Sequence, residues 1–123
     1  MRPSEDLIPI VIKALGSENF TVAQTAALYL AEHGPPSAED ALWHRLEALW
    51  TAWQGRASEL PDVMMPIGDD LRAQSAMLEQ ALTSALAHAR NWRLSRAELD
   101  RLRAGCLTQT CRDITDGKLS LSL

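Results

Sequence analysis

Three polar side chains could bring acid–base chemistry or metal binding to one face of a helix. Asp40, His44 and Glu47 are spaced by four and three residues, which places them one turn apart. A histidine oriented by a carboxylate can act as a general base or hold a metal ion. No second histidine or cysteine lies nearby at a spacing that would complete a ligand set. We therefore interpret the pattern as a solvated helix face.

Motifs for catalysis and cofactor binding are absent from the rest of the chain. There is no G-x-S-x-G, no P-loop and no G-x-G-x-x-G. His33 lies where a helix is expected to end, and His88 lies at the edge of an apolar helix face. We expect a protein that is not an enzyme and that uses no cofactor and no metal.

The two cysteines, Cys106 and Cys111, are five residues apart. On a single helix that spacing separates them by about 140°, too far for a disulfide without unwinding the helix. The sequence therefore predicts two reduced thiols and a cytoplasmic protein. No apolar run near the start is long enough for a signal peptide or a membrane span, so we expect no membrane association.

Charge divides the chain into two halves. The net charge is −4; residues 1–70 carry −7 and residues 71–123 carry +3. The basic half contains a cluster beside Trp92, made up of Arg90, Arg93, Arg96, Arg101 and Arg103. These arginines could contact phosphates or an acidic partner. The alternative that we favour is pairing with carboxylates of the first half, within the chain or across a dimer.

Tryptophan is the second candidate for binding. Trp43, Trp50 and Trp53 fall on one face of the helix expected at residues 38–54. Core packing accounts for such a face most simply. Tryptophan is also a preferred anchor at protein interfaces, so an exposed member would indicate a partner. Together with Leu78 and Leu82 of the next helix, these residues form the predicted partner-binding face.

Composition favours helices as the elements that position these residues. Leu supplies 19 residues and Ala 18, whereas Val and Ile together supply eight. Caps and apolar periodicity predict a single domain over residues 1–123, an all-α, compact bundle of about five helices. The predicted helices span residues 8–15, 21–33, 38–54, 69–91 and 95–116, with a packed irregular loop at 55–68 and a tail at 118–123. An earlier start for the first helix, near Ser4 with a kink at Pro9, is left open.

Two of these helices are expected in the centre. The second, after a capping box formed by Thr21 and Gln24, is apolar nearly all round and should be buried. The fourth has a leucine stripe on one side and small residues on the other, so it should pack on both faces. The tail, Leu119–Leu123, alternates polar and apolar residues, which suits an edge strand or a frayed end with an apolar contact.

A small, acidic, helical protein of this kind suits a non-enzymatic regulatory or adaptor role of the antiactivator, inhibitor or chaperone type. It would act on another protein or on itself as a homodimer, with the tryptophan face as anchor and the arginines setting orientation. The alternative is a DNA-binding transcriptional regulator. It would use the helix pair at residues 22–53, which superficially resembles a helix-turn-helix unit, or the Arg90–Arg103 cluster. Glu39 and Asp40 at the tip of that pair would repel phosphates, so nucleic acid is disfavoured.

Overall fold

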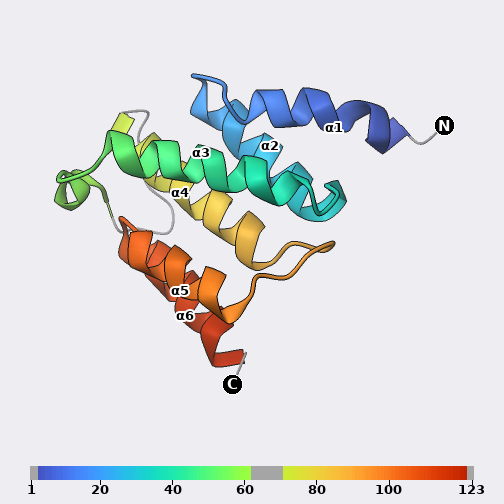
Figure 1. The fold of residues 1–123 in the computed structure, drawn as a ribbon. Coiled ribbons are helices and arrows are strands. Elements are labelled where there is room, and N and C mark those ends of the chain that lie inside the picture. Colours follow the sequence, from blue (N-terminus) through green and yellow to red (C-terminus); the bar gives the residue numbers. More distant parts are fainter. Residues whose placement is uncertain (1–2, 62–70, 122–123) are drawn as a thin grey trace.

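A computed structural model describes residues 3–61 and 71–121 (Figure 1). The described residues are all-helical, which confirms the predicted fold class. The elements are α1 (Pro3–Ala14), α2 (Phe20–His33), α3 (Ala38–Ala52), η1 (Ala57–Glu59), α4 (Leu71–Ala87), α5 (Arg96–Gly105) and α6 (Gln109–Leu121). None of these helices is long and apolar enough to cross a bilayer.

Helix α4 is the centre of the bundle, and it contacts α2, α3 and α6. In Figure 1 it runs behind α3, with α1 and α2 at one end of the molecule and the α5–α6 pair at the other. Its leucines Leu78, Leu82 and Leu86 are fully buried, and small residues on other sides, such as Ala73 and Ala76, are also buried. The prediction of a fourth helix packed on both faces is confirmed.

Helix α2 differs from the prediction at its start and in its burial. Its N-cap is Asn19, whose Oδ1 accepts hydrogen bonds from the backbone N–H groups of Thr21 and Val22 at 3.0 and 3.4 Å. The helix buries a stripe of small residues and one leucine: Ala23, Ala26, Ala27 and Leu30. Because alanines let the backbone of α4 come close, the larger side chains of Val22 and Leu28 are left outside, 42% and 54% exposed. The expectation of burial all round is therefore wrong.

The C-terminal part contains two helices where the sequence suggested one. Ser95 and Glu98 form the predicted capping box at the start of α5. The helix ends at Gly105, and α6 begins at Gln109 and continues to Leu121. Residues 118–121 of the predicted tail are thus helical, and residues 122–123 lie outside the described part.

At the other end, α1 begins at Pro3 and carries Pro9 within it, so the earlier of the two proposed starts is right. Of the predicted packed loop, η1 and the buried Leu60 are described. Residues 62–68 of that loop, and the predicted start of the fourth helix at 69–70, lie outside the described residues.

Candidate functional site

Most of the predicted partner-binding face belongs to the core of the chain itself. Trp43 and Trp53 are each 5% exposed, Trp92 is 8% exposed, and Leu78 and Leu82 are completely buried. Helix α4 packs against α3, and the apolar arc of α3 that the periodicity identified belongs to the buried core. This fold therefore does not present these five residues to a partner, and the predicted surface is corrected to a buried one.

Polar partners within the chain hold the tryptophans of α3. The indole N–H of Trp43 donates to Glu39 at 3.1 Å, and the Arg101 guanidinium lies 4.3 Å from the centre of its ring system. Trp50 is half-buried and donates its indole N–H to Glu79 at 2.8 Å. These contacts fix the rings as parts of the fold.

The arginine cluster is largely paired with carboxylates. The ion pairs join Arg90 to Glu32, Arg96 to Asp100, Arg101 to Glu47 and Arg103 to Asp116, at distances from 2.6 to 3.7 Å. All of these side chains are between 44% and 73% exposed. Within the described residues, Arg93 is exposed and forms no ion pair. Much of the positive charge that would attract phosphates is thus neutralised inside the chain.

Asp40, His44 and Glu47 are all exposed, as expected for a solvated face. Asp40 and His44 border a depression of about 460 Å³ between α1 and α3, which Lys13 and Arg45 also line. The Nε of Arg45 donates to the carbonyl of Leu15 at 2.7 Å, so this cation caps the end of α1. The described part of the chain contains no group of three or more His, Cys, Asp or Glu side chains placed to hold a metal ion.

Two carboxyl groups meet where α3 faces α5. Burial and the neighbouring Glu98 raise the pKa of Glu39 to about 7. The hydrogen bonds from Glu39 and from the backbone of Ser95 lower the pKa of Glu98. The two neighbouring carboxyl groups thus have pKa values shifted in opposite directions, upward for Glu39 and downward for Glu98.

Sequence reasoning missed the most completely bonded polar residue, Glu79 of α4. Its side chain is fully buried, and Oε2 accepts from Trp50 Nε1 at 2.8 Å and from the backbone N–H of Leu107 at 2.7 Å. Oε1 accepts from the backbone N–H and the hydroxyl of Thr108 at 3.1 and 2.7 Å. All four partners are donors, which is the environment of an ionised carboxylate. A signal was present, since Glu79 is the one charged residue between positions 73 and 87.

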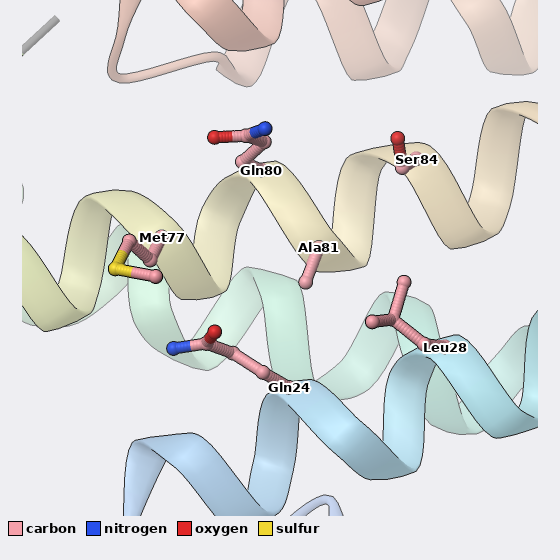
Figure 2. A pocket seen from close by; sticks show the side chains of 6 residues that line it. All are labelled: Gln24, Leu28, Met77, Gln80, Ala81 and Ser84. Carbon is pink, nitrogen blue, oxygen red and sulfur yellow. The ribbon is translucent and has the colours of Figure 1, made fainter. Parts of the chain in front are cut away.

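A groove lies between α2 and α4. The α2–α4 groove has a volume of about 200 Å³ and is lined by Gln24, Leu28, Met77, Gln80, Ala81 and Ser84. Figure 2 shows Leu28 and Gln24 rising from α2 toward Ala81 and Met77, with Gln80 and Ser84 on the far side of α4. Leu28, Ala81 and Met77 form its apolar part, with the Gln24 amide beside them, and Gln80 and Ser84 lie along the edge of α4 that faces away from α2.

Exposed apolar side chains gather at the same end of the molecule. Among the described residues there are five exposed large apolar side chains, and four of them lie on α1 and α2: Leu7, Ile10, Val22 and Leu28. The fifth is Leu71.

Comparisons with models of protein families, with curated proteins and with solved structures gave no match for this chain.

Proposed function

We propose that the protein is a non-enzymatic regulatory or adaptor protein that binds another protein through the α2–α4 groove. The observation that carries the proposal is Leu28, a leucine that is 54% exposed in a groove between two helices. An exposed leucine beside Met77 offers apolar area that association with a partner would cover.

The chemistry of the groove supports binding of a protein segment. Gln24, Gln80 and Ser84 supply amide and hydroxyl groups that can pair with a partner's backbone. None of the six lining side chains titrates near neutral pH, so the groove itself offers no acid or base. Its volume of about 200 Å³ is below the range of pockets that enclose small-molecule ligands, and it suits one or two inserted side chains.

The test compares the affinity of the wild type for its partner with that of two groove variants. Leu28→Ser removes the apolar anchor, and Ser84→Arg places a long side chain at the rim. We expect each to weaken binding by about tenfold or more, as truncation at an interface hot spot does. Leu71→Ser is the matched control, because Leu71 is exposed to a similar extent, 61%, and does not line the groove.

DNA binding and self-association are separate arms of the same experiment. Binding of duplex DNA would contradict the proposal and favour the DNA-binding regulator, if its affinity falls steeply with salt and is the same in the wild type and in Leu28→Ser. If the partner is a second copy of the chain, the wild type is a dimer by mass and Leu28→Ser shifts it to monomer. Loss of affinity in Leu71→Ser equal to that in Leu28→Ser would also contradict the groove.

A further inference from the structure

A disulfide joins the two cysteines across the junction of α5 and α6. This corrects the prediction of two reduced thiols: the spacing argument assumed one helix, whereas Cys106 follows the end of α5 and Cys111 lies in the first turn of α6. Their Cα atoms are 5.5 Å apart, an ordinary separation for a disulfide. The bond closes a small ring that contains Leu107 and Thr108.

The ring holds the dipeptide that binds the buried carboxylate of α4. The backbone N–H groups of Leu107 and Thr108 both donate to Glu79, which also accepts from Trp50 of α3. Gly105 lies so close to Trp50 that a Cβ at position 105 would overlap the indole ring. The disulfide and Glu79 are thus two separate restraints on one segment, and that segment joins α5 and α6 to the rest of the bundle.

The two cysteine residues differ in their exposure. Cys111 is completely buried, while Cys106 is half-buried. Cys106 is therefore the more exposed of the two disulfide residues and the one that a reagent from solution would meet first, whereas Cys111 is enclosed by the fold.

We propose that Cys106–Cys111 is a reversible thiol–disulfide switch. Reduction by a dithiol would release Leu107 and Thr108 from Glu79 while the remaining helices stay folded. This inference concerns the α5–α6 junction, whose residues do not line the α2–α4 groove, and it goes beyond the proposed function.

A dithiol can reduce the Cys106–Cys111 disulfide in two thiol–disulfide exchange steps. Its thiolate attacks Cys106 Sγ, the S–S bond breaks, and Cys111 leaves with the electron pair as a thiolate that then takes a proton. The second thiol of the reductant attacks the mixed disulfide, frees Cys106 as a thiol, and leaves the reductant oxidised by two electrons. The Thr83 hydroxyl, 3.2 Å from Cys111 Sγ, and the N-terminal turn of α6 stabilise the departing negative charge.

Amide hydrogen exchange of the full-length protein, before and after millimolar dithiothreitol, tests the proposal. We expect alkylation to trap two thiols under native conditions. The amides of Leu107 and Thr108 should lose roughly 10- to 100-fold in protection, the scale expected when a short covalent ring is opened. The amides of Leu82 and Leu86 in α4 should keep their protection, and removal of the dithiol should restore the original pattern.

The Cys106→Ser/Cys111→Ser double variant is the matched control. It should show the weak protection at Leu107 and Thr108 without dithiothreitol and should not respond to it. The switch is contradicted if the disulfide is reduced only in denaturant, or if reduction leaves Leu107 and Thr108 as protected as before. It is equally contradicted if reduction removes protection throughout α4, because the bond would then hold the whole fold.

Discussion

Replacing Glu79 with glutamine tests whether one carboxylate joins three parts of the bundle. Glutamine has nearly the same shape, but it presents one acceptor oxygen and one NH₂ group to four donors. Whichever way the amide turns, two buried donors lose their acceptor. Each such loss costs about 1–3 kcal/mol, so the free energy of unfolding should fall by about 2–6 kcal/mol. For a domain of this size that corresponds to a drop in Tm of roughly 8–24 °C.

Urea denaturation followed by circular dichroism measures this change, with Glu47→Gln as the control. Glu47 is also a hydrogen-bonded carboxylate, but its side chain is 49% exposed, so the control should lose less than about 1 kcal/mol. Trp50→Phe keeps the ring and removes one donor to Glu79. It should cost less in the Glu79→Gln background than in the wild type, by about 1 kcal/mol. A Glu79→Gln protein within about 0.5 kcal/mol of wild type would refute the reasoning.

Three further predictions concern the glycine at the α5–α6 junction, the α5 cap and the paired carboxylates. Gly105→Ala should lower the free energy of unfolding by about 1–3 kcal/mol because the added methyl group meets Trp50. Gly117→Ala should raise it by about 0.5–1 kcal/mol, because a methyl group at position 117 in α6 meets open space. Thermal denaturation measures both changes. Ser95→Ala should cost about 1 kcal/mol in the same assay through loss of the helix cap. The pKa of Glu39 is raised by burial to about 7 from 4.5, so the folded state binds more protons in that window. This contribution to stability is complete below pH 4.5 and is lost as the pH rises through 7; Glu39→Gln should remove that slope, and an unchanged slope would show that another group causes it.

The parts of the fold that the sequence predicts well are those set by local signals. Ser95 and Glu98 satisfy each other within one turn, and Gly34 ends α2 where the periodicity stops. The leucines of α4 follow a single repeating stripe, so their burial could be predicted from spacing. In each case the decisive interaction lies within a few residues of the signal.

The sequence-based predictions are wrong where the structure depends on contacts between residues that are far apart in the sequence. Leu28 belongs to an apolar run, yet the alanines beside it let α4 come so close that the leucine is left at the surface. The break between α5 and α6 depends on Glu79, which lies 28 residues before Leu107. The Glu79 carboxylate accepts a hydrogen bond from the Leu107 backbone N–H, which in a continuous helix would bond to a backbone carbonyl instead. On one continuous helix the cysteine spacing predicts two free thiols, whereas the break between α5 and α6 brings the two Cα atoms to 5.5 Å from each other.

The binding surface predicted from the sequence differs from the groove in the structure for a related reason. A tryptophan face indicates burial, but the sequence does not show whether the cover comes from the same chain or from a partner. The structure covers Trp43, Trp53 and Trp92 with the chain's own helices. The groove at Leu28 is formed by two helices more than 35 residues apart in the sequence, so no local pattern could have identified it.

Site-specific photocrosslinking in the cells that produce the protein tests the proposed function most directly. A photoreactive residue at position 28 should yield one dominant protein-containing product, and the Ser84→Arg substitution should suppress it. The same residue at position 71, which is exposed outside the groove, should give no such product. Equal crosslinking from both positions, or a product at position 28 that Ser84→Arg leaves unchanged, would contradict binding through the α2–α4 groove.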